Sequence, residues 1–382
     1  MILTISEFLG GNTLTEALKF ATLRASVLQP NNHNSHSGED LSPQARLAGV
    51  TVHQLATQFP DTPFVKLRVI GFGSVDRSPR LGSFEAWTFD GRRPSSRSRG
   101  LSGRPDRDRL TEIAHVFCPL SAWPLIASTS VSFYELPCEP SPLEGGEWKL
   151  SPHILISAID VAAADPEIDV LLIPTRLDFL GAKDYEDQFR AALGDAHEKG
   201  KLIILAGGER RPLGQPAGVK VPASAAAGVG LVLGALLSAG TPHPLACRVS
   251  PGLPMAPYPS LWAPGEFEVW NPHRPVAGHP AGLWRRGSHL AAACTAALAC
   301  RLLAMSRKTD FGRKMTPSEL RRVIINSSQP VSGDAACQKL DYSRALADMI
   351  ALLDQRPSTV WRIQKWWCGI QIWYRKLFRK GG

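Results

Sequence analysis

The sequence lacks a long apolar run. Among its 382 residues, the longest weakly polar stretch is Val221 to Leu237, which is rich in Ala and Gly and interrupted by Ser224. A membrane-spanning helix needs about 18 consecutive apolar residues, and no uninterrupted run approaches that length. The amino terminus also has no basic region before its first carboxylate, Glu7, so no secretory signal peptide is indicated. We therefore expect a soluble, cytoplasmic protein.

Clustered cysteines and nucleotide-binding motifs are also missing. The seven cysteines are odd in number and never closer than six residues. They are Cys118, Cys138, Cys247, Cys294, Cys300, Cys337 and Cys368. This spacing indicates neither a disulfide framework nor a CxxC metal site, and we expect most of them to be buried free thiols. Neither GxGxxG nor GxxxxGK[ST] occurs, so the sequence predicts no nucleotide cofactor, and we expect no metal.

Acidic residues are fewer than basic ones, 34 against 43, which leaves a net charge of +9. Much of the excess lies between Gly91 and Arg109, where seven arginines are opposed only by Asp106 and Asp108. Ser, Gly and Pro separate these arginines, so the composition favours a solvated loop that buries little. Because no aromatic residue is interleaved to stack on a base, the segment does not favour a nucleic-acid partner.

Apolar residues make up 44% of the chain, enough for one large α/β domain or two small ones. Three short apolar runs have the pattern of parallel strands buried on both faces: 65–70, 168–173 and 201–206. Helical patterns lie between them, at 154–164 and 184–199. This alternation predicts a doubly wound, mostly parallel sheet with helices on both faces.

Three further helices are expected toward the carboxyl end. The segment 287–305 is rich in Ala and Leu with almost no charge, so it should run through the middle of the core. Thr316-Pro317-Ser318-Glu319 has the residues of a capping box, with proline at the first helical position, and predicts a helix that begins there. A short amphipathic helix follows at 341–354.

These patterns divide the chain into three parts. Residues 1–60 hold one helical stretch, Leu14 to Leu28, and a polar linker. Residues 61–335 form the predicted α/β domain, and residues 336–382 form a carboxyl-terminal helix and a basic, aromatic tail.

Several short motifs occur in an order that has a parallel in a known family. They are Ile70-Gly71-Phe72-Gly73, Arg109-Leu110-Thr111-Glu112-Ile113-Ala114, Ile168 to Arg176, Ala206-Gly207-Gly208-Glu209 and Gly287-Ser288-His289-Leu290-Ala291. Taken in order, they resemble the motifs of the subtilisin-like serine peptidases, the subtilases, over residues 64–331. The resemblance implies a subtilisin-like α/β fold and places the chain beside serine-type endopeptidases that carry out proteolysis.

The positions that the family uses for catalysis are all occupied by other residues here. By the resemblance, Gly71 stands for the triad aspartate, Arg109 for the histidine, His289 for the serine and Glu209 for the oxyanion-binding asparagine. Serine attack needs an imidazole base and a carboxylate that orients it, whereas a guanidinium stays protonated at neutral pH. An ionised carboxylate at the oxyanion position would repel the developing charge. The sequence therefore predicts a catalytically inactive pseudoenzyme.

The groove that binds substrate in the family is altered as well. Its lining strand ends in Pro174-Thr175-Arg176, where the family has a glycine that admits a peptide backbone. Ser288 adjoins the nucleophile position, but one residue along a helix rotates a side chain by about 100°. His289 could pair with Glu209 and form a base without a nucleophile. The blander interpretation makes Ser288 a helix cap and makes His115 and His289 satisfied buried histidines.

Three hypotheses follow from these substitutions. The preferred one is a subtilase-like protein that has lost catalysis and acts by binding a protein or peptide that the sequence does not identify. The second is an active serine-type endopeptidase or other hydrolase that uses non-family residues. The third is a degraded gene copy with no function.

The tail between Trp361 and Lys380 contains six cations and no carboxylate. At about 100° per residue, its apolar side chains, except those of Trp361 and Ile372, fall in one arc of about 140° and its cations in the opposite arc. The residues that define this pattern include Trp366, Trp367, Trp373, Arg375 and Lys376. The pattern is typical of a helix on an anionic membrane surface or of a target helix for a calmodulin-like groove. The alternative is that the apolar arc packs back on the domain. A membrane-peripheral location is therefore one expectation.

Overall fold

The computed structural model describes part of the chain. The described residues are 65–75, 84–92, 94–95, 108–117, 129–140, 148–174, 183–208, 226, 228–237, 240–244, 261–270, 282–308, 315–331 and 334–354. The expected helix at Leu14 to Leu28, the linker after it and the tail from Trp361 to Lys380 lie outside these residues.

The centre of the protein is a ten-stranded sheet with the order β13-β14-β10-β9-β8-β7-β1-β4-β2-β3. Its strands are β1 (Val65–Phe72), β2 (Glu85–Phe89), β3 (Pro94–Ser95), β4 (Thr129–Leu136), β7 (Val170–Ile173), β8 (Leu202–Ala206), β9 (Gly230–Leu236), β10 (Leu261–Pro264), β13 (Gln329–Val331) and β14 (Asp334–Lys339). The pairs from β2 across to β10 and on to β14 are parallel, while β3 and β13 pair antiparallel at the two ends. Two small hairpins stand apart: β5 (Cys138–Pro140) with β6 (Trp148–Leu150), and β11 (Glu266–Trp270) with β12 (Gly282–Arg286).

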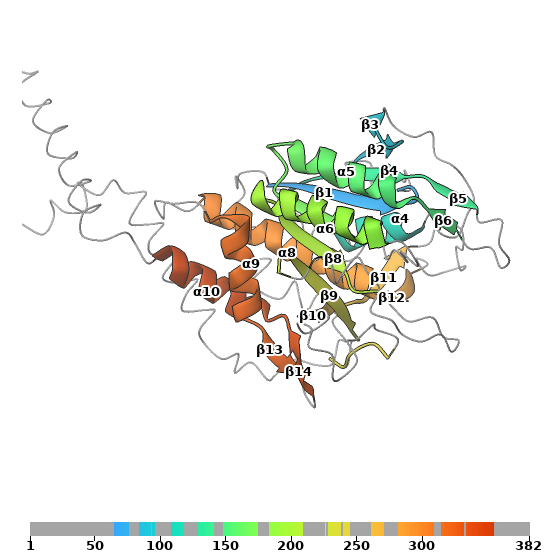
Figure 1. The fold of residues 1–382 in the computed structure, drawn as a ribbon. Coiled ribbons are helices and arrows are strands. Elements are labelled where there is room, and N and C mark those ends of the chain that lie inside the picture. The colour runs from blue at the N-terminus through green and yellow to red at the C-terminus, as the bar shows by residue number, and fades with distance from the viewer. Residues whose placement is uncertain are drawn as a thin grey trace, which may run out of the picture.

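Helices cover both faces of the sheet (Figure 1). On one face, α5 (Pro152–Ala164) and α6 (Lys183–Glu198) pack against the buried residues of one hydrophobic cluster. The other face carries α4 (Asp108–Phe117), α8 (Ser288–Lys308), α9 (Pro317–Asn326) and α10 (Tyr342–Asp354), which share a second, larger cluster. The expected doubly wound, mostly parallel α/β architecture is confirmed.

Helix α8 runs through this second cluster. Nearly every residue from Ser288 to Ser306 is buried, because small and apolar side chains surround the helix on all sides. Among the described helices, it alone is long and apolar enough to cross a membrane by length and composition, and 94% of that stretch is buried inside the protein. Its apolar character is thus accounted for by its place in the core, as the composition predicted.

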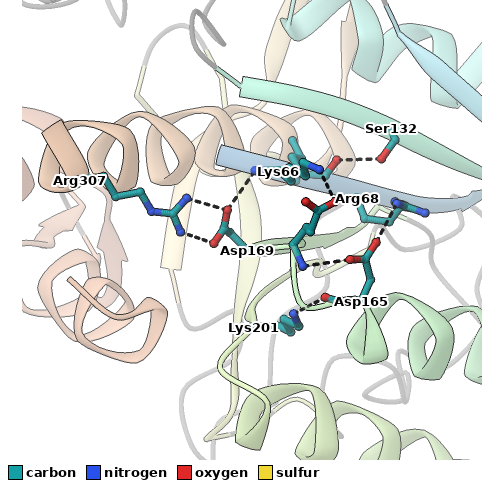
Figure 2. A network of polar contacts seen from close by, with 9 residues as sticks. Lys66, Arg68, Ser132, Asp165, Asp169, Lys201 and Arg307 are labelled. Atoms are coloured by element: carbon teal, nitrogen blue, oxygen red, sulfur yellow. Dashed lines mark hydrogen bonds and ion pairs between the residues drawn. The ribbon is translucent and has the colours of Figure 1, made fainter. Parts of the chain in front are cut away.

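The amino-terminal edge of the parallel strands holds a network of charges (Figure 2). Asp169, just before β7, binds the guanidinium of Arg307 near the end of α8 through both carboxylate oxygens and also accepts the backbone N–H of Lys66 at 3.0 Å. Lys201, just before β8, donates its Nζ to the carbonyl oxygens of Asp165 and Ile168 at 2.6 and 2.8 Å. The pKa of Lys201 is lowered, and the largest cause is the burial of its side chain. The pair of Asp169 with Arg307 fixes the carboxyl-terminal end of α8 against the sheet.

Candidate functional site

The carboxyl-terminal edge of the sheet brings together the starts of α4 and α8. Gly71 is the penultimate residue of β1, Arg109 lies in the first turn of α4, and His289 is the second residue of α8. Helix α4 contacts both neighbours, because Thr111 Oγ1 donates to the carbonyl oxygen of Ser74 at 3.4 Å and Glu112 hydrogen-bonds His289. The side chain of Arg109 lies outside the described part of the structure.

His289 forms a buried pair with Glu112. Its Nε2 lies 2.9 Å from Glu112 Oε2, and the two side chains are 11% and 12% exposed. The second carboxylate oxygen, Oε1, lies 3.0 Å from Nε of Arg285, whose side chain is 41% exposed on β12. A carboxylate therefore bridges an imidazole and a guanidinium at the position that the resemblance assigns to the nucleophile.

Ser288, the first residue of α8, is held by the end of β8. Its Oγ accepts the backbone N–H of Gly208 at 2.9 Å, and the residue is 1% exposed. The sequence suggested that this hydroxyl caps its own helix, whereas the contact shown reaches across the sheet edge to a residue 80 positions away. The hydroxyl thus serves as a backbone acceptor between two elements.

The turn into α8 is fixed by backbone bonds from neighbouring strands. Gly287 donates its N–H to the carbonyl oxygen of Gly265 at 2.8 Å, and Gly265 donates to Leu236 at 2.9 Å. A Cβ on Gly265 would stand 2.7 Å from the Gly287 carbonyl oxygen, so only glycine allows this approach. The positions of Ser288 and His289 are therefore set by the ends of β8, β9 and β10.

A second buried carboxylate lies beside Gly71. Glu135 on β4 pairs with Gly71 in the strand register, is 5% exposed and accepts the N–H of Val75 at 2.7 Å through Oε1. The resemblance placed an aspartate at Gly71, and the carboxylate nearby instead holds the loop that follows β1. Its described contact is with backbone.

Other predicted positions are only partly visible. Pro174 follows β7 and is buried. Glu209, Thr175 and Arg176 lie outside the described residues, so the predicted pairing of His289 with Glu209 is not tested, although the partner that His289 does show is Glu112. His115, on the last turn of α4, is buried at 2% exposure.

The sequence alone did not indicate roles for Glu112, Arg285 and Glu135. Glu112 is part of the hexapeptide that resembles the family's histidine motif and stands one helical turn after Arg109, a spacing that puts both on one side of a helix. That spacing could have indicated Glu112 as a residue of the site. Arg285 and Glu135 carried none, because their roles depend on the β11–β12 hairpin and on the β1–β4 register.

The arrangement supplies an oriented imidazole without a partner to activate. Within the described residues, His289 makes no polar contact besides that with Glu112, so it bonds no hydroxyl or thiol there. No group of three or more His, Cys, Asp or Glu side chains that could hold a metal ion occurs in this part of the chain. The geometry suits holding a ligand through a fixed histidine.

The fold was compared with known proteins. No protein-family model matches the sequence, and no curated protein matches it. Among solved structures, the PatG macrocyclase domain covers 85% of this chain and 99% of its own, with a TM-score of 0.58 and 14% identity. The match with the prenylagaramide maturation protease PagA covers 79% of this chain and 99% of PagA, with a TM-score of 0.55 and 17% identity. The match with MycP1 without its amino-terminal propeptide covers 77% of this chain and 94% of MycP1, with a TM-score of 0.53 and 20% identity. These neighbours are subtilisin-like protease domains, and the protein described here has the subtilisin-like α/β fold.

Proposed function

We propose that this protein is a catalytically inactive subtilisin-like domain that binds a peptide or a protein segment. The observation that carries the proposal is that His289, in the first turn of α8, pairs with Glu112 of α4. The distance from His289 Nε2 to Glu112 Oε2 is 2.9 Å. By the resemblance, this is the place of the nucleophile. An imidazole held by a carboxylate can accept or donate a hydrogen bond but forms no acyl-enzyme of the serine type.

The neighbouring hydroxyl does not replace the missing nucleophile. Ser288 Oγ is 1% exposed and accepts the Gly208 N–H, and the described contacts of His289 do not include it. A general base has to lie within hydrogen-bond reach of the proton that it removes. Arg109, at the family's histidine position, cannot act as a base because its guanidinium stays protonated.

Binding is the function that such a site can keep. One structural neighbour, the PatG macrocyclase, was solved in complex with peptide, and several others are described as proteases, so this fold accommodates peptide chains. In this protein, Ser288 ties the start of α8 to Gly208, and Thr111 ties the start of α4 to Ser74. A domain that retains this framework and loses the triad chemistry can hold a peptide without cleaving it.

The test combines a search for turnover with a search for binding. We expect the purified protein to leave casein and succinyl-peptide anilides uncleaved and to remain unlabelled by a fluorophosphonate, because no activated serine is expected. We also expect peptides selected from a displayed random library to bind it reversibly. Fluorophosphonate labelling that disappears in Ser288→Ala would overturn the proposal in favour of an active hydrolase with non-family residues. Failure to unfold cooperatively would instead favour a degraded gene product.

A further inference from the structure

The tautomer of a neutral His289 follows from the groups around its Nε2. Glu112 is next to the guanidinium of Arg285, 3.0 Å away, so its carboxylate is the anion of an ion pair. An ionised carboxylate can only accept hydrogen bonds. The 2.9 Å contact therefore requires Nε2 of His289 to donate, so a neutral His289 carries its proton on Nε2.

Nδ1 of His289 is consequently left as an acceptor. His289 has no further polar contact, and Nδ1 is not among the buried side-chain nitrogens without a partner in the described part of the chain. The 11% of the side chain that stays exposed therefore includes Nδ1. A lone pair faces outward at the point where the resemblance places the nucleophile.

The ring that carries this lone pair is held in place from several sides. Glu112 fixes it from α4, while Ser288 and Gly287 tie the first turn of α8 to Gly208 and Gly265. Helix α8 behind it is buried along its length. A preorganised acceptor loses little conformational entropy when a ligand binds, which makes it an effective recognition group.

We propose that Nδ1 of His289 accepts a hydrogen bond from a backbone N–H of a bound peptide, with Glu112 and Arg285 as the residues that position the ring. This inference rests on the proposed peptide-binding function and specifies how the site recognises its ligand. A donor is required because a carbonyl or carboxylate oxygen would meet the lone pair of the ring and be repelled. Peptide amides present such donors along the whole chain.

The tautomer can be measured without any ligand. In protein labelled with ¹⁵N-histidine at about pH 8, above the ordinary titration range of histidine, we expect the His289 ring to show a protonated Nε2 and an unprotonated Nδ1. The signal is assigned by its loss in His289→Gln. In Glu112→Gln the ring should become a mixture of the two tautomers. A ring protonated on Nδ1 in the unmodified protein would overturn the proposal.

Binding tests the second half of the proposal. The probes are peptides selected on the unmodified protein from a displayed random library, with calorimetry as the readout. A glutamine at 289 can still reach Glu112 but has no atom at the place of Nδ1, whereas an asparagine can put its Oδ1 there. We expect His289→Gln to weaken binding about tenfold, which corresponds to one hydrogen bond of about 1.4 kcal/mol, and His289→Asn to weaken it less.

A chemical change in the peptide identifies the donor. Replacing each backbone amide in turn by an ester removes one N–H, and one such replacement should weaken binding to the unmodified protein but not to His289→Gln. The inference fails if every ester analogue binds the unmodified protein as tightly as the original peptide does and if His289→Gln binds the original peptide equally tightly. The proposed function would then still stand. If no library peptide binds the unmodified protein, the proposed function fails, and the assigned ligand fails with it.

Discussion

The two edges of the central sheet use their charged groups in different ways. At the amino-terminal edge, Asp169 binds Arg307 through both carboxylate oxygens and also accepts the Lys66 N–H (Figure 2). At the carboxyl-terminal edge, the described part of the chain binds the imidazole of His289 through Nε2 and not through Nδ1. At the first edge the carboxylate of Asp169 is saturated by protein groups, whereas at the second edge Nδ1 of His289 is left as a hydrogen-bond acceptor. The comparison separates a structural network from the proposed recognition site on the same helix.

The largest effect on stability is expected at the saturated edge. Asp169→Ala would leave the guanidinium of Arg307, whose side chain is 22% exposed, without its carboxylate. Losing one partner of a largely buried pair costs about 3 kcal/mol or more. Urea denaturation should show this decrease in the free energy of unfolding. The matched control is Glu186→Gln, which breaks a more exposed ion pair with Arg190 on α6 and should cost less than about 0.5 kcal/mol. Equal losses of unfolding free energy in Asp169→Ala and Glu186→Gln would contradict the distinction between a buried structural network and an exposed ion pair.

A smaller loss is expected where the carboxyl-terminal edge is packed by backbone. In Gly265→Ala, the new methyl group would stand 2.5 Å from Ala235 Cβ and 2.7 Å from the Gly287 carbonyl oxygen. Relieving this overlap should cost about 2 kcal/mol. The control is Gly194→Ala in α6, where nothing lies within 4 Å, so improved helix propensity should raise stability by about 0.5 to 1 kcal/mol. A loss of stability in both variants would indicate a general intolerance of larger residues.

Ser288→Ala tests whether this hydroxyl has the structural role assigned to it. The variant removes the acceptor of the Gly208 N–H in a site that is 1% exposed. We expect a loss of about 1 kcal/mol in unfolding free energy and faster hydrogen exchange at Gly208. The exposed Ser318→Ala on α9 should change stability by less than about 0.5 kcal/mol. Unchanged exchange at Gly208 would contradict the hydrogen bond.

The sequence predicted best what depends on neighbouring residues. The capping box at Thr316 and Glu319 is present as expected, because both of its hydrogen bonds join residues three positions apart. The composition of α8 likewise predicted its place in the core. Strand β4 was not singled out, since Ser132 and Glu135 interrupt its apolar pattern although both are buried.

The site could be predicted only in outline. The order of the motifs pointed to Gly71, Arg109 and His289, but the pair of His289 with Glu112 joins residues 177 positions apart. No local pattern reports such a contact, because it depends on how α4 packs against α8. The predicted roles of Glu209, Thr175 and Arg176 remain predictions.

The smallest effect on stability is expected from deleting residues 361–380, for which an anionic membrane is one of the predicted partners. Among the residues whose burial the structure describes, every Val, Ile, Leu, Met, Phe, Trp and Tyr is buried or half-buried. Among these residues there is therefore no fully exposed large apolar side chain that would need the apolar arc of the tail as cover. The deletion should leave the melting temperature nearly unchanged and abolish sedimentation with phosphatidylserine vesicles.

Charge replacements distinguish membrane binding by the tail from a general effect of net charge. Changing Arg375, Lys376, Arg379 and Lys380 to Gln should strongly reduce vesicle binding, since each cation near the surface contributes about 1 kcal/mol. The same change at Arg92, Arg93, Arg97 and Arg99 removes equal charge from a segment without aromatic residues and should have little effect. Added salt should weaken binding, because the attraction is screened over about 10 Å. A deletion that lowers the melting temperature by several degrees, in a protein that ignores vesicles, would instead make the tail a structural helix of the domain.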